Sequence, residues 1–368
     1  MTDPGQPAQG DPAAFNPLDG AEGDPSVFWE EVAGLRRVAA DRAEPLERRL
    51  EAFEDIMESE VGDTSFLRAR KLESEFSLRQ IYLKFEGGNP TGTQKDRIAF
   101  SQVLDAMRRG FDAITLATCG NYGVAAALAA SMCRLRCIVY VPETYRPSRL
   151  GEIQDLGAEV VRAGGDYEAA VALSSERAAK EELYDANPGG QNTLLQLRAY
   201  GEISYEIYDE LRDAPAAVAV PVSNGTTLAG IYKGFLSLYR RGKTSRMPRL
   251  VAGSAFNKNP IVLAFRRGRP VCEDLPPHVV RESRVNEPLI NWHSSDGDHA
   301  LEALRKSHGW AHNATDRMMT DFCRLLREKE GYHVLPASTA GLIALLERNK
   351  SERLPSDRYV AVLTGKKA

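Results

Sequence analysis

The sequence predicts an α/β fold built on parallel strands, and two regularities carry that prediction. Apolar runs of strand length alternate with segments whose apolar residues recur at helical spacing. Between residues 112 and 161 the strands begin about 20–25 residues apart, which leaves room for a crossover helix between strands that pair in parallel. Such alternation is typical of sheets with helices packed on them. The predicted strands are 80–86, 112–117, 137–142, 157–161, 216–222, 249–254 and 359–365.

The first 27 residues stand apart from this pattern. They are rich in Pro, Gly, Ala and Asp and contain almost no large apolar residue, which predicts a disordered tail. From Trp29 to Glu60, charged and apolar residues recur at helical spacing, which predicts an amphipathic helix that covers the core or a partner subunit. Further helices are predicted at 95–107, 124–132, 146–156, 167–179, 198–211, from 231 onward, and at 314–326.

The composition and net charge of the chain limit the classes of molecule that it could bind. The net charge is −4 and the pI is about 6.0, which argues against nucleic-acid and anionic-membrane partners. No apolar run reaches membrane-spanning length. The five cysteines are odd in number and lack the spacing of a metal site, so we expect free thiols and no metal. The sequence therefore predicts a cytoplasmic protein of ordinary globular composition.

The segment from Asn89 to Arg97 carries the strongest chemical signal. It joins the strand at 80–86 to a helix whose first turn contains Lys95. Pro90 and Gly92 favour a tight turn between the two elements. The positive end of a helix disfavours a cation, which should lower the pKa of Lys95. A lysine with a lowered pKa is a usable imine-forming nucleophile.

Two later loops have the form of anion-binding sites. The apolar strand at 112–117 runs into 118–123 and then a helix rich in small residues. The apolar strand at 216–222 runs into 223–230, after which a helix is predicted to open at Ile231. In both cases free N–H groups and the helix dipole point at one spot, as in phosphate cradles.

These motifs together resemble the pyridoxal-phosphate enzymes of the tryptophan-synthase-β class, also called fold type II. The nonapeptide at 89–97 looks most like the lysine motif of threonine synthase, with Thr93 and Gln94 as departures. The resemblance implies two open twisted, mainly parallel sheets with flanking helices, and a cofactor in the cleft between two domains. It places a large domain at 28–94 and 186–368, and a small domain at 95–185.

The resemblance also implies a role for each motif. Lys95 would hold pyridoxal 5'-phosphate as a Schiff base and later act as the general base. Asn121 would face the ring hydroxyl, and Thr364 would meet the ring nitrogen. The implied cofactor-binding residues are Lys95, Asn121, Ser223, Asn224, Gly225, Thr226, Thr227 and Thr364, and the implied substrate-binding residues are Thr91, Thr118, Cys119, Gly120 and Asn187.

Some positions depart from the threonine synthase pattern. Asp185 stands two residues before Asn187, and Gly190 replaces the arginine that helps to hold the substrate phosphate in that family. Because a carboxylate repels phosphate, these changes argue against phosphohomoserine as the substrate. Leu335 replaces a glutamate of the class, and the sequence ends at Ala368 without the family's C-terminal lid.

Three functions remain open from the sequence. The first is a threonine synthase-like lyase or replacement enzyme that eliminates a β- or γ-leaving group from an amino acid and adds water or another nucleophile. The second is a β-replacement enzyme of the cysteate or cysteine synthase kind, or a threonine or serine dehydratase. The third is a catalytically silent pyridoxal-phosphate-binding protein. The resemblance also implies a homodimer.

Overall fold

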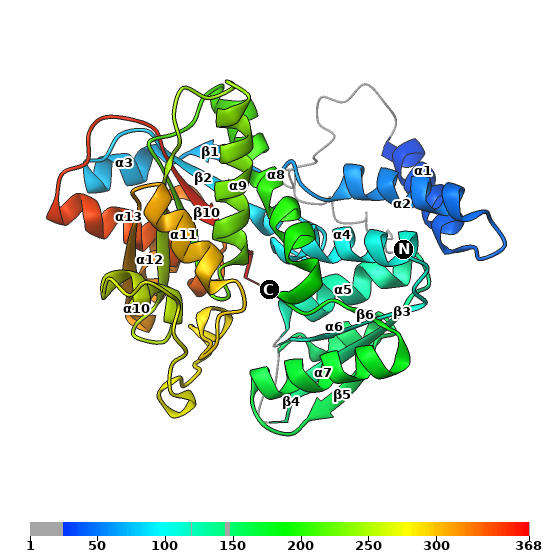
Figure 1. The fold of residues 1–368 in the computed structure, drawn as a ribbon. Helices are drawn as coiled ribbons and strands as arrows, with labels where there is room; N and C mark the ends of the chain where they lie inside the picture. Colours follow the sequence, from blue (N-terminus) through cyan, green and yellow to red (C-terminus); the bar gives the residue numbers. More distant parts are fainter. Residues whose placement is uncertain (1–24, 119, 144–147, 368) are drawn as a thin grey trace, which may run out of the picture.

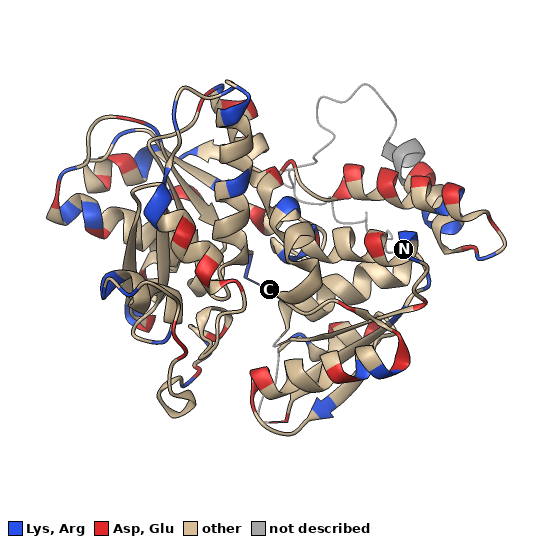
Figure 2. Ribbon diagram, in the orientation of Figure 1, with Lys and Arg blue, Asp and Glu red and all other residues tan. Residues whose placement is uncertain are grey.

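A computed structural model of the protein describes residues 25–118, 120–143 and 148–367. In this part of the chain the strands form a six-stranded sheet and a four-stranded sheet. Figure 1 shows the two sheets in separate lobes, with the C-terminus between them. Figure 2 shows acidic and basic residues spread over the helices of both lobes. The predicted α/β class with two mainly parallel sheets is confirmed.

The larger sheet has the strand order β1-β2-β10-β7-β8-β9. Strand β1 is antiparallel to its neighbour β2, while the other pairs in this sheet are parallel. The last strand therefore lies beside one of the first, which brings Tyr359 next to Ile81. The strands are β1 (Phe66–Arg68), β2 (Ile81–Phe85), β7 (Ala217–Pro221), β8 (Arg249–Ala255), β9 (Trp310–Ala314) and β10 (Tyr359–Leu363).

Helices cover both faces of the larger sheet. Side chains of successive strand residues point to opposite faces, and in β10 Val360 and Val362 pack in one core cluster while Ala361 and Leu363 pack in another. The first cluster includes residues of α8 and α9, and the second includes residues of α12 and α13. The helices of this lobe are α3 (Arg70–Phe76), α8 (Thr193–Leu211), α9 (Thr226–Arg240), α10 (Pro260–Arg266), α11 (Gly297–Lys306), α12 (Asp316–Glu330) and α13 (Ala340–Ser351).

The smaller sheet has the order β5-β4-β3-β6, and its pairs are parallel. Ala113 and Ala117 of β3 share a core cluster with α7, whereas Ile114 and Leu116 share one with α4 and α5. These four strands lie within 95–185, the predicted small domain, whose boundaries stay a prediction. The elements are β3 (Ala113–Ala117), β4 (Arg136–Pro142), β5 (Glu159–Ala163), β6 (Tyr184–Asp185), α4 (Lys95–Arg108), α5 (Asn121–Met132), α6 (Leu150–Asp155) and α7 (Tyr167–Glu181).

The N-terminal prediction is wrong in two respects. Helix α1 (Pro25–Ala40) begins inside the predicted tail, whose residues 1–24 lie outside the described part. The single helix predicted from 29 to 60 is two helices, because a turn at 41–45 separates α1 from α2 (Leu46–Glu60). Pro45 has an extended backbone and directly precedes α2. Since proline lacks the N–H that a continuing helix needs, it marks a new start.

A second correction bears on function. Helix α9 begins at Thr226, whereas the sequence predicts its start at Ile231. Gly225, with φ 94°, is the residue that turns the chain into the helix. The end of the Gly/Ser/Thr loop is therefore the first turn of α9, and its N–H groups are those left unpaired at a helix N-terminus. Helices α5 and α8 also begin earlier than predicted, at Asn121 and Thr193.

Within residues 25–118, 120–143 and 148–367, none of the helices combines the length and the hydrophobicity of a transmembrane span.

Candidate active site

A cavity of about 220 Å³ lies where loops of the two sheets meet. Its walls include the segments that follow β2, β3, β7 and β10, all at the carboxyl ends of parallel strands. Open α/β sheets bind their ligands in this position. The part of the lining that these segments supply is Gln94, Lys95, Thr118, Gly120, Asn121, Tyr122, Val222, Ser223, Asn224, Gly225, Thr226, Thr227, Leu228 and Thr364.

Lys95 is the first residue of α4 and lines the cavity. Its Nζ lies 5.5 Å from the ring centroid of Tyr122. Burial lowers the pKa of Lys95 to about 8, although the carboxylate of Asp296 acts in the opposite direction. Burial favours the neutral amine because the charged form loses its hydration. Lys95 is thus an amine whose uncharged, nucleophilic form is accessible near neutral pH.

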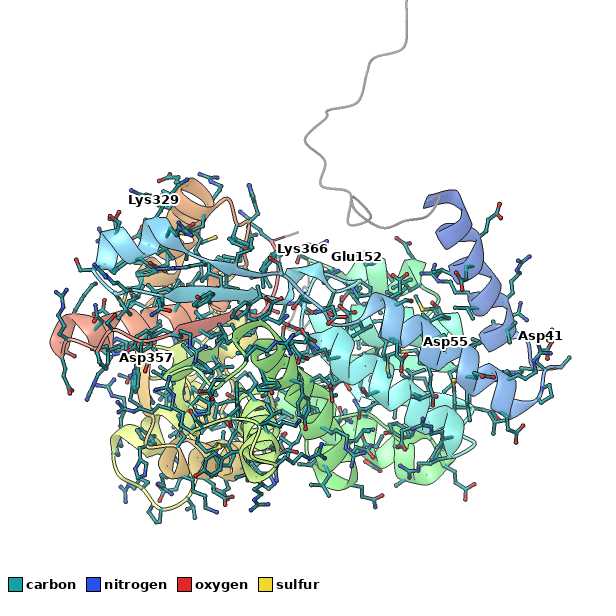
Figure 3. All side chains as sticks on the ribbon, turned by 90° about the horizontal axis from the view of Figure 1, so that it is seen from above. Asp41, Asp55, Glu152, Lys329, Asp357 and Lys366 are labelled. Atoms are coloured by element: carbon teal, nitrogen blue, oxygen red, sulfur yellow. The ribbon has the colours of Figure 1, made fainter. Side chains whose placement is uncertain are left out.

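The end of the chain holds the lysine loop in place. Thr364 O accepts a hydrogen bond from the N–H of Gln94 (3.0 Å), and the N–H of Lys366 donates to Gly92 O (2.9 Å). Gly92 has φ 82°, and a Cβ there would lie 2.5 Å from Cε of Lys366. The backbone angle strains any other residue, and a side chain at this position would also have to displace that of Lys366. Figure 3 places Lys366 in the middle of the molecule, between the lobes.

The loop after β3 orients its polar groups toward the cavity. Gly120, with φ 147°, directly precedes α5. The hydroxyl oxygen of Thr118 accepts hydrogen bonds from the N–H groups of Gly120 (3.1 Å) and Gly123 (3.2 Å). Arg149 donates to Oδ1 of Asn121 (3.0 Å), and among the described residues the amide nitrogen of Asn121, which lines the cavity, has no hydrogen-bond acceptor.

The loop after β7 fits a phosphate group. Gly225 precedes the first residue of α9, and a Cβ on Gly225 would lie 2.8 Å from Cβ of Ala300. The backbone is therefore packed as closely as glycine allows, with the N-terminal N–H groups of α9 at the cavity. Behind this loop, the hydroxyl of Thr226 donates to Oδ2 of Asp296 (2.5 Å), and Thr193 donates to Oδ1 (3.3 Å).

Two hydroxyl groups meet on the opposite wall. Oγ of Ser338 and Oγ1 of Thr364 are 3.1 Å apart, and either can donate to the other. Ser338 can also donate to Gly365 O (3.2 Å). Both residues line the cavity. A ring nitrogen at this wall would meet neutral hydroxyl partners.

The structure brings together most residues that the sequence points to. It places Thr91 and Asn187 outside the lining of this cavity. The hydroxyl and N–H of Thr91 donate to Oδ2 of Asp96. Oδ1 of Asn187 accepts from the N–H of Ala117 (2.7 Å), so its position fixes the loop after β3. Cys119 lies outside the described residues. The predicted site residues that line the cavity are Lys95, Thr118, Gly120, Asn121, Ser223, Asn224, Gly225, Thr226, Thr227 and Thr364.

Other residues in or next to the lining of the cavity carry no signal that sequence reasoning could have used. Tyr122 lies inside the predicted loop, but nothing in its spacing shows that its ring faces Lys95. Asp296 precedes α11 and reaches the site only through the packing of α11 on α9. Four carboxylates from segments far apart in the chain also come together at the cavity only through the folding of the chain. They are Asp166, Glu168, Glu282 and Glu287.

Comparisons with known proteins agree with this geometry. Residues 57–365 match the family described as pyridoxal-phosphate dependent enzyme. The chain is 30% identical to a threonine synthase of Methanocaldococcus jannaschii over 311 residues, which are 83% of this chain and 74% of that protein. It is 31% identical to a threonine synthase of Synechocystis over 288 residues, 78% of this chain and 71% of that protein.

Solved structures share the fold. Maize serine racemase superposes with a TM-score of 0.73 at 15% identity, covering 87% of this chain and 92% of that one. A threonine deaminase from Solanum lycopersicum superposes with a TM-score of 0.70 at 15% identity, covering 94% and 91%. The family match spans most of the described chain and contains the lysine, the glycine loops and the closing strand. The chain therefore belongs to the pyridoxal-phosphate-dependent enzymes of fold type II.

Proposed function

We propose that this protein is a threonine synthase-like lyase or replacement enzyme, which eliminates a β- or γ-leaving group from an α-amino acid and adds water or another nucleophile. The observation that carries the proposal is the amine of Lys95, with its pKa lowered to about 8, facing a cavity with a phosphate-binding loop. The similarity to threonine synthases supports the same class of reaction. The homodimer and the cytoplasmic location stay predictions.

The residues that line the cavity would perform three tasks: binding the cofactor phosphate, orienting the cofactor ring and binding the carboxylate of the substrate. The N–H groups at the start of α9 would hold the cofactor phosphate, and Asn121 and the hydroxyl pair of Ser338 and Thr364 would orient the ring. The N–H groups at the start of α5, with the hydroxyl of Thr118, would bind the carboxylate of the amino acid. Pyridoxal phosphate, when bound, supplies the electron sink for the carbanion chemistry.

Lys95 would perform the proton transfers. Its Nζ lies above the ring of Tyr122 and is free of hydrogen bonds to the side chains that the structure describes. Once the amino acid has taken its place in the cleft, the neutral amine of Lys95 can accept the α-proton of the substrate. The loss of hydration at this position makes the uncharged form of the amine far more accessible near neutral pH than it is for an ordinary lysine.

A titration with amino acids tests the proposed function. The purified chain should take up pyridoxal phosphate and show a yellow absorbance band, which changes when a substrate binds. The panel is homoserine, O-phosphohomoserine, serine, O-phosphoserine and threonine, with the keto-acid and amino-acid products measured. Diversion of the product by an added thiol would assign β-replacement. A chain that takes up no cofactor would contradict the proposal.

The uptake of cofactor should depend on the charge of Lys95. Because burial lowers the pKa of Lys95 to about 8, the neutral fraction rises with pH, reaches one half near that value and is nearly complete about one pH unit above it. The rate of cofactor uptake should therefore increase about tenfold per pH unit below about pH 7 and level off above about pH 9. Stopped-flow absorbance measures this rate. A rate that still climbs steeply at about pH 10 would show a lysine with an ordinary pKa.

Asp296 should weaken the binding of the cofactor phosphate. Its carboxylate accepts the hydroxyl hydrogen of Thr226, a residue of the phosphate loop. Burial raises the pKa of Asp296, and the hydrogen bond from Thr226 opposes that shift. In Asp296→Asn the acceptor oxygen remains while the negative charge is lost, so pyridoxal phosphate should bind about tenfold more tightly.

A comparison of two ligands isolates the effect of charge. Pyridoxal has the same ring and aldehyde as pyridoxal phosphate but no phosphate group. Its dissociation constant, followed by absorbance, should change less than that of pyridoxal phosphate in Asp296→Asn, because pyridoxal responds to the effect of Asp296 on Lys95 alone. Equal changes for the two ligands would mean that Asp296 acts on Lys95 or on the shape of the loop and not on the phosphate.

A further inference from the structure

One wall of the cleft is acidic. The carboxylates of Asp166, Glu168, Glu282 and Glu287 line it, whereas the only Lys or Arg in the described lining is Lys95. Asp166 and Glu168 lie at the start of α7, in the lobe of the smaller sheet. Glu282 and Glu287 belong to the irregular segment that follows α10 in the other lobe. Because these carboxylates share the cavity with Lys95, the wall they form is part of the same ligand site.

Hydrogen bonds across the cleft fix two of these carboxylates. Nε1 of Trp292 donates to Oδ2 of Asp166 (2.8 Å). The N–H groups of Trp292 (3.2 Å) and His293 (3.3 Å) both donate to Oε1 of Glu168. The irregular segment is therefore docked on the first turn of α7, and it carries its own acidic residues to the mouth of the cavity. The carboxylate of Glu168 is thereby held in place at the cavity lining.

The environment of Glu287 differs from that of Asp166 and Glu168, whose carboxylates are held by hydrogen bonds. It is the first residue of a short 3₁₀ helix, η4 (Glu287–Leu289), and its carboxylate has no hydrogen-bond or ion-pair partner among the described side chains. Burial, and then the nearby charge of Glu282, raises the pKa of Glu287 to about 7. A partly buried carboxylate without a partner is costly. A cation that entered the cleft would remove this cost, whereas a second anion would increase it.

The nearby cations do not neutralise this wall. Arg149 donates to Asn121 and forms an ion pair with Glu152 on α6 (2.7 Å). Arg281 and Arg284 lie in the irregular segment, but both are exposed and neither lines the cavity. Among the described residues the distal end of the cleft is therefore negative, while the N-termini of α5 and α9 are its positive ends.

Resting on the proposed function, we infer that this cleft selects α-amino acids whose side chain ends in a positively charged amino group, and that it disfavours phosphate esters. The carboxylate of such a substrate would lie at the N-terminus of α5. Its second amino group would then face Glu287 and Glu168 on the acidic wall. Charge would set the preference, because carboxylates attract an ammonium group and repel a phosphate group.

Three amino acids of equal chain length test the inference. 2,4-Diaminobutyrate, homoserine and O-phosphohomoserine carry an ammonium, a hydroxyl and a phosphate group on the same carbon atom. Each is titrated into the full chain loaded with pyridoxal phosphate, and the change in absorbance gives an apparent dissociation constant. We expect 2,4-diaminobutyrate to bind about tenfold or more tightly than O-phosphohomoserine, with homoserine between them. Tighter binding of O-phosphohomoserine would overturn the inference.

Glutamine variants show whether the acidic wall causes the preference. Glu287→Gln and Glu168→Gln keep the size of the side chain, and glutamine can still accept the N–H groups of Trp292 and His293. Each variant should reduce the ratio of the two dissociation constants about threefold or more, with the cofactor band unchanged. The matched control is Glu328→Gln on α12, which is exposed and does not line the cavity. A ratio unchanged in both cleft variants would overturn the inference.

The outcomes separate this inference from the proposed function. If the cofactor binds and all three amino acids change its absorbance equally, the proposed function stands and the charge preference is wrong. If no cofactor binds, the proposed function is wrong and the inference falls with it. If 2,4-diaminobutyrate binds preferentially but no product forms, the charge preference is supported and the proposed reaction is contradicted.

Discussion

Replacing Lys95 with alanine is expected to abolish the yellow absorbance of the cofactor-loaded protein and to reduce turnover by about 10²–10⁴-fold or more, the contribution of a positioned general base. Lys95 is the amine that the cavity holds with a lowered pKa, facing the ring of Tyr122. No second lysine occurs in the described lining that could replace it. Visible absorbance and product formation measure the two effects separately.

A matched lysine controls for the loss of a charge. Lys233 lies on α9, is exposed and does not line the cavity. Lys233→Ala should keep the absorbance band and the rate of turnover. Circular dichroism should show that both variants are folded. A Lys95→Ala protein that keeps the yellow band would mean that another amine binds the cofactor, and the proposed site would then be wrong.

The lysine loop could be predicted because its determinants are local. The alternation of apolar residues gives β2, the helical spacing gives α4, and Gly92 lies where the turn needs φ 82°. The same holds for the strand and glycine loop before α5 and for the phosphate loop before α9. In each case a few consecutive residues contain the strand end, the turn and the free N–H groups.

The remaining parts of the site depend on contacts between distant segments. Thr91 and Asn187 stand where the family pattern puts substrate residues, yet Asp96 and Ala117 take up their hydrogen-bonding groups. The acidic wall joins Glu168 at the start of α7 to an irregular segment 124 residues later, which has no period from which its position could be predicted. The early start of α9 depends on a glycine whose conformation the sequence alone does not show.

A buried cluster of charges supports the lysine loop from behind. Arg97, two residues after Lys95, donates from Nε and Nη2 to the carboxylate of Glu86 (2.6 and 2.9 Å). It also donates from Nη1 and Nη2 to Glu206 of α8 (2.6 and 2.9 Å), which forms an ion pair with Lys84 as well. The side chains of Arg97 and Glu86 are 3% and 0% exposed. The cluster therefore ties β2, α4 and α8 together where water cannot screen it.

Replacing Glu86 with glutamine is expected to lower the free energy of unfolding by about 3–5 kcal/mol, because Arg97 and Lys84 would then share Glu206 and the buried cluster would hold an unbalanced positive charge. The amide nitrogen of glutamine would also oppose a donor of Arg97. Urea unfolding of the cofactor-free chain measures the loss. The control is Glu54→Gln, since Glu54 pairs with Arg108 on the surface, where the side chains are 37% and 53% exposed. An exposed pair contributes about 0–1 kcal/mol, so equal losses in the two variants would show that the buried cluster does not stabilise the lysine loop.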